Sequence, residues 1–283
     1  MTHSQSRSHL GMLWLTFLLS LSTTTVSTAA NPGILLEDLT WFEAEKILRP
    51  ESVVVIPLGA AAKEHGPHLK LKNDFILAEY YKGRVLKESN VIVAPTLNYY
   101  FYPSFVEYPG STSLRLETAR DVVIDICRGL AKFGPKRFYI LNTGLSTVFA
   151  LKLAAEALAS DGIAITFTDL ESIAAVKDKI RKQEGGSHAD EIETSMMLYI
   201  APATVDMSKA MKNYDPNEKG GLSRTPHNDQ DYSPSGIWGD PTLATREKGE
   251  RVAEALVAAL LTDIEETRKA PLPTAPAPPP APL

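Results

Sequence analysis

Short runs of apolar residues alternate along this chain with longer segments in which apolar side chains recur every three or four positions. The short runs, rich in β-branched and aromatic residues, lie at 53–58, 91–94, 138–141 and 163–167. The longer amphipathic segments lie at 74–88, 116–133, 147–159, 171–183, 189–200 and 247–269. Strands that alternate with helices in this way predict an α/β fold, with parallel βαβ units and helices on both faces of a mostly parallel sheet.

The body of the chain, residues 31–269, has no internal repeat and no linker, which predicts a single domain. Within it, residues 203–246 are rich in Gly, Pro, Asn and Asp and have little periodicity. A loop of this length inside a compact domain is usually functional. Ligands of an open α/β sheet bind beyond the carboxyl ends of the strands. The loops after these strands are therefore where we expect the site.

The two ends of the chain differ in composition from the body. Arg7 precedes an apolar run at 10–21, and the polar stretch that follows ends in small residues at 27–30. This order is typical of a secretory signal peptide, and the run is shorter than the ~20 residues that span a bilayer. We therefore expect 1–30 to be a leader, the mature chain to be periplasmic or secreted without a membrane span, and the Pro-rich residues 270–283 to form a disordered tail.

Composition limits the chemistry further. The 283 residues carry 29 basic and 34 acidic side chains, for a net charge of −5. No run of Lys or Arg stands out, which argues against nucleic-acid binding. The single cysteine, Cys127, excludes an intramolecular disulfide framework and a thiolate zinc cluster. Any chemistry therefore has to use His, Asp and Glu.

The loop after the first strand gathers side chains that bind metals. Glu64, His65, His68 and Asp74 lie within eleven residues of one another. Divalent ions such as zinc take imidazole and carboxylate ligands, so this pattern indicates a metal site or a catalytic site. In the alternative, Asp74 caps the next helix and the histidines are surface residues.

A second candidate segment begins at the glycine pair 185–186. Ser187 and Asp190 resemble a capping pair, which places His188 in the first turn of a helix, where the macrodipole disfavours its protonated form. Glu191 is expected one turn further along the same face. A neutral histidine near a metal suits general acid–base catalysis. The alternative is a capping segment that contains an incidental histidine.

The candidate segments belong to a set of four motifs. In chain order these are Glu64-His65-Gly66-Pro67-His68-Leu69 through Asp74, Tyr108-Pro109-Gly110-Ser111-Thr112-Ser113-Leu114, His188-Ala189 with Glu193-Thr194-Ser195, and Trp238-Gly239-Asp240-Pro241. Their order resembles that of the creatininase family of metal-dependent amidohydrolases. The resemblance implies a three-layer αβα fold, a site with two divalent ions (zinc or manganese), hydrolysis of cyclic or small amides, and assembly as a hexamer. It matches His65 and Asp74 to metal ligands, with Asp74 as the bridge. His188 matches the histidine that passes a proton to the leaving nitrogen, with Glu193 nearby.

The chain departs from the family pattern in two places. That pattern reads Glu-x-His-Gly, whereas Glu64 directly precedes His65, so Glu64 reaches a metal only if the loop bulges. The third strand of metal-binding members ends in Asn-Gly-His, whereas this chain continues from Asn142 to Gly144 and Ser146, with glycine and serine at two ligand positions. The site then holds one ion, recruits substitute ligands, or has lost the metal. The candidates for substitute ligands or for the pocket are His68, His188, Glu191, His227, Asn142 and Ser146.

Two functions remain in view. In the first, the chain is a secreted hydrolase that cleaves the C–N bond of a small cyclic or linear amide with metal-activated water. Its metal ligands would be Glu64, His65 and Asp74, and its catalytic residues would be His188, Glu193 and Glu191. In the second, it is a creatininase-like binding protein without metal or catalysis. A serine hydrolase using Ser146 is a third reading, but the sequence around Ser146 is not the nucleophile-elbow pattern. His227 is expected to be a surface residue unless it supplies a ligand.

Overall fold

The central sheet has five parallel strands in the order β1-β3-β2-β4-β5. A computed structural model describes residues 1, 32–217, 222–226 and 231–274. The strands are β1 (Ile34–Leu35), β2 (Val53–Leu58), β3 (Ile92–Val93), β4 (Arg137–Asn142) and β5 (Ala164–Phe167). Strands β2 and β4 pair in register along their whole length, from Val53 opposite Arg137 to Leu58 opposite Asn142. The predicted mostly parallel sheet is confirmed.

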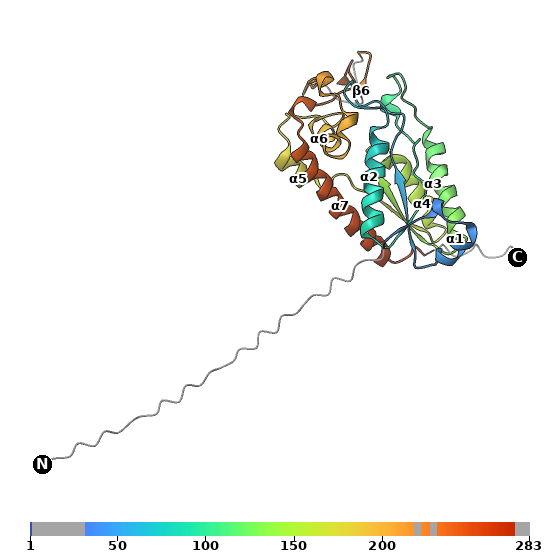
Figure 1. Cartoon of the computed structure of the whole chain (residues 1–283). Helices are drawn as coiled ribbons and strands as arrows, with labels where there is room; N and C mark the ends of the chain where they lie inside the picture. The colour runs from blue at the N-terminus through green and yellow to red at the C-terminus, as the bar shows by residue number, and fades with distance from the viewer. Residues whose placement is uncertain (2–31, 218–221, 227–230, 275–283) are drawn as a thin grey trace.

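Helices cover both faces of this sheet (Figure 1). One face carries α1 (Trp41–Ile47), α3 (Leu116–Ala131) and α4 (Val148–Ala159). The other face carries α2 (Asn73–Glu88), α5 (Ala174–Ile180), α6 (Glu191–Ile200) and α7 (Arg246–Lys269). This is the three-layer αβα arrangement that the resemblance implies.

The alternation of side chains along β2 explains the two cores. Val54, Ile56 and Leu58 are buried against α3 and α4, whereas Val53 and Val55 are buried against α2 and α7. Successive side chains of a strand point to opposite faces, so a strand covered on both sides must be apolar throughout. The continuous apolar run in the sequence therefore corresponds to the central position of β2.

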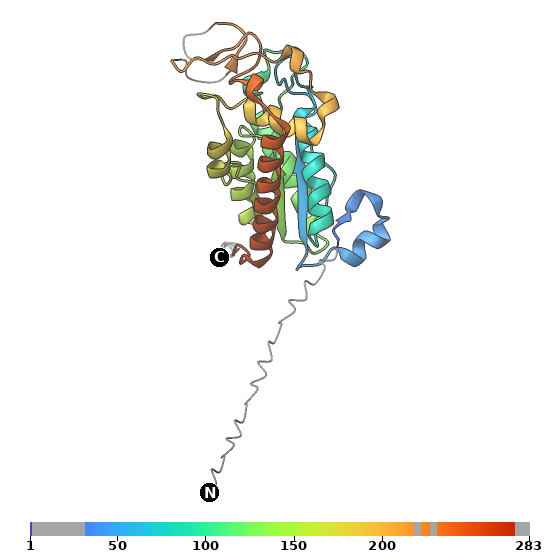
Figure 2. The same cartoon turned by 60° about the vertical axis from the view of Figure 1, so that its left-hand side comes forward.

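The segment between α6 and α7 lies at one end of the sheet (Figure 2). It contains short 3₁₀ turns and two short strands, β6 (Leu222–Ser223) and β7 (Asp231–Tyr232). It is tied to the loop after β2, because the Asp206 N–H donates to the His68 carbonyl at 2.8 Å. The hydroxyl of Tyr108 also donates to the Ser233 carbonyl. The described part of the long aperiodic segment therefore lies over the carboxyl ends of the strands.

Several predicted boundaries shift in the structure. The helix expected at 171–183 extends only over Ala174–Ile180, and the one expected at 189–200 begins at Glu191. Strand β1 and helix α1 were not predicted, because each is too short to give a periodic signal. No helix in the described ranges is long and apolar enough to cross a membrane. The expected leader, apart from Met1, and the end of the expected tail lie outside the described residues.

Candidate functional site

Asp74 is positioned by a close approach between the end of β2 and the start of α2. A Cβ on Gly59 would collide with the carbonyl of Asp74, so only glycine allows this contact. The Phe75 N–H donates to the Ala60 carbonyl at 3.0 Å, which fixes the first turn of α2 against the loop. Asp74 is completely buried there. The residue at the N-cap of α2 is Lys72 and no side chain caps it, so the alternative of Asp74 as a helix cap is wrong.

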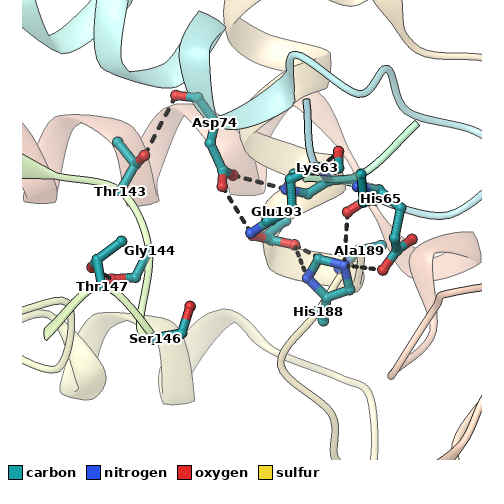
Figure 3. Close-up of polar contacts among 12 residues, drawn as sticks. Lys63, His65, Asp74, Thr143, Gly144, Ser146, Thr147, His188, Ala189 and Glu193 are labelled. Atoms are coloured by element: carbon teal, nitrogen blue, oxygen red, sulfur yellow. Dashed lines mark hydrogen bonds and ion pairs between the residues drawn. The ribbon is translucent and has the colours of Figure 1, made fainter. Parts of the chain in front are cut away.

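The carboxylate of Asp74 contacts two basic side chains from the preceding loop (Figure 3). Nε2 of His65 lies 2.8 Å from its Oδ1, and Nζ of Lys63 lies 2.7 Å from its Oδ2. Burial is the largest single influence and opposes both charges of the Lys63–Asp74 pair, but the attraction of the pair and of the neighbouring charged groups together outweighs it. This attraction raises the pKa of Lys63 and lowers the pKa of Asp74. The centre of the predicted metal site therefore contains a buried ammonium group.

His188 reaches the same place from the connection between α5 and α6. The N–H groups of Ser187 and His188 donate to the Trp238 carbonyl, and the Trp238 N–H donates back to the His188 carbonyl at 2.8 Å. Ala189 then takes a left-handed conformation with φ 47°, and its N–H donates to a carboxylate oxygen of Glu193. The His188 ring centroid lies 5.0 Å from that of His65. The predicted convergence of the two segments is confirmed.

His188 forms an ion pair with Glu64. Its Nε2 lies 2.8 Å from Oε1 of Glu64, whose other oxygen accepts the Gly66 N–H. Burial is again the largest single influence and opposes both charges, but the ion pair and the neighbouring groups, Glu193 for His188 and the Gly66 N–H for Glu64, together raise the pKa of His188 and lower the pKa of Glu64. The expected neutral His188 is therefore not what the structure favours. His188 precedes α6 instead of lying in its first turn, and its Nε2 is paired with Glu64.

Glu193 completes the cluster from the first turn of α6. Its Oε2 lies 3.7 Å from Nδ1 of His188. The side chain is 19% exposed, whereas that of Glu64 is 7% exposed and that of Asp74 is completely buried. Glu193 is thus the carboxylate of the cluster that is most accessible to a water molecule or a ligand.

Of these groups, Lys63, His188 and Glu193 line a cavity of about 760 Å³. Its wall combines the basic and acidic side chains with apolar surface and with the loop after β4, and includes Lys63, Phe105, Ser146, His188, Glu193 and Trp238. Cavities of about 300–1,000 Å³ with a few convergent polar groups are typical of small-molecule sites. The arrangement suits the binding of a small polar molecule next to an acid–base pair.

Gly186, two residues before His188, offers a direct test of how the site is built. Gly186 has φ 108°, and a Cβ there would collide with the backbone of Trp238 and Gly239. We expect Gly186→Ala to lower the free energy of unfolding by more than about 1 kcal/mol, measured by urea denaturation. The matched control is Gly83→Ala in α2, where a Cβ meets nothing within 4 Å. A helix interior favours alanine by about 0.5–1 kcal/mol, so an equal gain in both variants would contradict the strain at Gly186.

Two of the predicted site residues have structural roles. Glu191 is completely buried and contacts Lys248 of α7 at 2.5 Å, while its other oxygen accepts the Gln183 N–H. The expectation that it shares a face with His188 is wrong, because the left-handed turn at 189 separates the two side chains. His68 is buried, and its Nε2 lies 2.8 Å from the Thr194 hydroxyl.

The loop after β4 holds the remaining candidates. Asn142 donates to the Gly144 carbonyl and accepts the Gly144 N–H and the Thr147 hydroxyl, so it shapes the turn itself. Ser146 lines the cavity but lies across from the Asp74 cluster (Figure 3). His227 lies outside the described residues. The catalytic and ligand roles assigned from the sequence stay predictions.

Sequence reasoning missed Lys63, which lies against aromatic rings from the loop after β3. The rings of Phe105 and Tyr102 have centroids 4.6 Å and 5.6 Å from Nζ of Lys63. The pattern Glu-x-His-Gly contained the signal, since Lys63 stands two residues before His65, where the pattern has glutamate. Lys63 was missed because the sequence was searched for metal-binding side chains, and lysine is not one of them.

Comparison with known proteins identifies relatives across most of the chain. The family model described as creatinine amidohydrolase matches residues 37–264. Creatinine amidohydrolase of Pseudomonas putida is 27% identical over 257 residues, which cover 83% of this chain and 98% of the relative. A 3-dehydro-scyllo-inosose hydrolase of Thermotoga maritima is 25% identical, covering 80% of each chain. A mycofactocin precursor peptide peptidase of Mycolicibacterium smegmatis is 25% identical, covering 72% of this chain and 81% of the relative.

Solved structures agree with the fold. The structure described as creatininase Mn has a TM-score of 0.69 at 25% identity and covers 84% of this chain and all of its own. A mutant creatininase of the Zn-Zn type has the same TM-score and identity and covers 85% of this chain. The metals in these descriptions support a divalent ion for proteins of this kind.

The residues of this chain do not fit a cage for two such ions. His65, His188 and Glu193 do place ligand atoms within 4.8 Å of one another. However, Asp74, the expected bridge, is paired with Lys63, and Gly144 and Ser146 stand at two ligand positions of the resemblance. Two unit charges 4 Å apart interact by about 4 kcal/mol at an effective dielectric of 20, and a divalent ion doubles this repulsion from an ammonium group.

Proposed function

Because this chain belongs to the creatininase family, we propose that it is a hydrolase that cleaves the C–N bond of a small cyclic or linear amide. The observation that carries the proposal is that His188, Glu193 and Lys63 line one cavity, where His188 is paired with the buried Glu64. Two of the named relatives support it, since an amidohydrolase and a peptidase both hydrolyse C–N bonds. The cavity volume of about 760 Å³ favours a small substrate.

The protonation states in the cluster suggest the division of roles. Hydrolysis of an amide needs a base for the attacking water and an acid for the leaving nitrogen. Glu193 is the accessible carboxylate, so it accepts the proton of the water. His188, kept protonated by Glu64, gives its proton to the nitrogen as the C–N bond breaks. The proton on Glu193 then returns to His188 across the 3.7 Å that separate them.

The positive groups of the cavity stabilise the transition state. Attack of water on an amide carbonyl transfers negative charge to the carbonyl oxygen, and fixed charges or donors aimed at that oxygen lower the barrier. Lys63 lines the cavity and is held in place by Asp74. Its ammonium group would therefore interact with the developing oxyanion without reorganising.

The proposal is tested with a panel of small amides. Purified protein is incubated with creatinine, other five-membered lactams, formamides, linear primary amides and short peptides, and the released carboxylate and amine are measured by mass spectrometry. We expect turnover of one of these classes, and its loss in Glu193→Gln. If compounds of the panel raise the Tm but none is hydrolysed, the alternative of a binding protein is favoured and the hydrolase proposal fails.

A further inference from the structure

We propose that the ammonium group of Lys63 takes the place of the divalent ions at this site, as a built-in cation that neutralises Asp74 and faces the cavity. The chain would then hold no metal at Asp74. The part of this inference that concerns catalysis rests on the proposed hydrolytic function. The part that concerns the cation stands on the geometry around Lys63 alone.

The first step is the position of the ammonium group. Lys63 is only 5% exposed, although lysine is almost never fully buried unless it is paired. Its Nζ lies 2.7 Å from Oδ2 of Asp74, and the rings of Phe105 and Tyr102 lie close enough for cation–π contact. One carboxylate and two aromatic faces therefore surround this charge. Such surroundings fix an ammonium group in a single place.

The second step is the charge around it. Besides Asp74, the carboxylates of Glu64 and Glu193 also attract Lys63. Buried charges must be compensated by partners of opposite sign or by a metal. The carboxylates of Asp74 and Glu64 are buried and that of Glu193 is partly exposed, so this cluster requires positive charge, and Lys63 supplies it from the middle of the cluster. A bound ion is not needed for this compensation.

The third step is the space beside Gly144, where the resemblance has a histidine ligand. A Cβ on Gly144 would lie 3.5 Å from Cε1 of Tyr102 and 3.2 Å from Cγ2 of Thr147. The ring of Tyr102 and the side chain of Thr147 therefore adjoin this position. Tyr102 therefore adjoins both positions, because its ring edge faces Gly144 and its ring face contacts Lys63.

The fourth step concerns an ion among His65, His188 and Glu193. Both imidazole groups already face carboxylates through Nε2, at 2.8 Å from Asp74 and 2.8 Å from Glu64. An ion there would also lie near the ammonium group that is bound to the other oxygen of Asp74. The geometry therefore favours Lys63 over an ion as the cation of this site. The metal analysis below tests this, because it would detect a single bound ion.

The experiment measures metal content. Wild-type protein is incubated with zinc or manganese, desalted, and analysed by inductively coupled plasma mass spectrometry. We expect less than about 0.2 ion per chain, and a Tm that neither metal nor EDTA shifts. In Lys63→Glu we expect bound metal and a rise of Tm by several degrees in zinc, because an ion that binds only the folded state stabilises it. Lys63→Gln, which removes the charge without adding a ligand, should lie between the two.

The matched control is Lys70→Gln, an exposed lysine of the same loop, which should behave like wild type. A wild-type chain with one or more ions overturns the proposal even if every variant fails to fold. A folded Lys63→Glu chain that binds no more metal than Lys70→Gln also overturns it. The proposed function fails separately: a metal-free protein that hydrolyses no amide of the panel leaves the lysine inference standing and removes the hydrolase.

Discussion

Replacing His188 by glutamine is expected to lower kcat/KM by about 10²–10⁴-fold, the usual contribution of a general acid. Glutamine can still donate a hydrogen bond to Glu64, which in wild type lies 2.8 Å from Nε2 of His188. It cannot give a proton to the leaving nitrogen. The variant should therefore fold normally and bind substrate, so that the loss appears in kcat more than in KM. Steady-state kinetics on the substrate found in the amide panel measure this effect.

The matched control is His68→Gln. His68 is buried beside Thr194, and burial lowers its pKa to about 4, so it is neutral near pH 7. We expect its substitution to leave kcat unchanged. The pH profile gives a second readout, because the pKa of His188 is raised. Wild-type activity should fall as the pH rises through that raised pKa, and this alkaline limb should disappear in His188→Gln. Wild-type kinetics in His188→Gln would refute its role as the acid.

Asp74→Asn is expected to lower the free energy of unfolding by about 3–5 kcal/mol, which is typical when one partner of a buried ion pair is removed. The ammonium group of Lys63 would remain in the protein interior without its 2.7 Å partner, and His65 would lose its contact as well. Urea denaturation at pH 7 measures the change. The control is Asp161→Asn, which breaks an exposed pair with Arg128 at 2.8 Å and should cost far less.

Combining Asp74→Asn with Lys63→Met should restore part of the lost stability, because the double variant leaves no unpaired ammonium group. A double variant less stable than Asp74→Asn would show that Lys63 has other buried partners that matter more. The sign of the pH dependence is a further check. Since the folded pKa of Asp74 is lowered, its contribution is present above its ordinary value near 3.8 and is lost as the pH falls below it.

Much of the fold follows from local patterns. The apolar run at 53–58 predicted a strand buried on both faces, and β2 occupies the centre of the sheet. The rule that ligands bind beyond the carboxyl ends of parallel strands pointed to the loop that holds His65, and the motif order of the resemblance joined His188 to it although the two are far apart in sequence. The positions of single side chains were less predictable. Glu191 was expected beside His188, but one left-handed residue, Ala189, turns it toward α7.

The expected export, the hexamer, the nature of the substrate and the metal dependence stay predictions. The first concerns a leader that lies, apart from Met1, outside the described residues. The second concerns contacts between chains. Neither follows from the packing of one chain, since a signal sequence is removed by other proteins and an oligomer depends on a second copy. The remaining two are decided by the amide panel and by the metal content of the protein.

By itself, the sequence determined the αβα class and the segments that supply Glu64, His65, Asp74 and His188, because periodicity and motif order are properties of the chain read in one dimension. Only the tertiary structure decided which charges meet. Gly59 lets α2 approach the strand end until Asp74 reaches Lys63, and the turn at Ala189 brings Glu193 to His188. Coulombic attraction depends on distances of a few ångströms within a buried site, and those distances are set by packing.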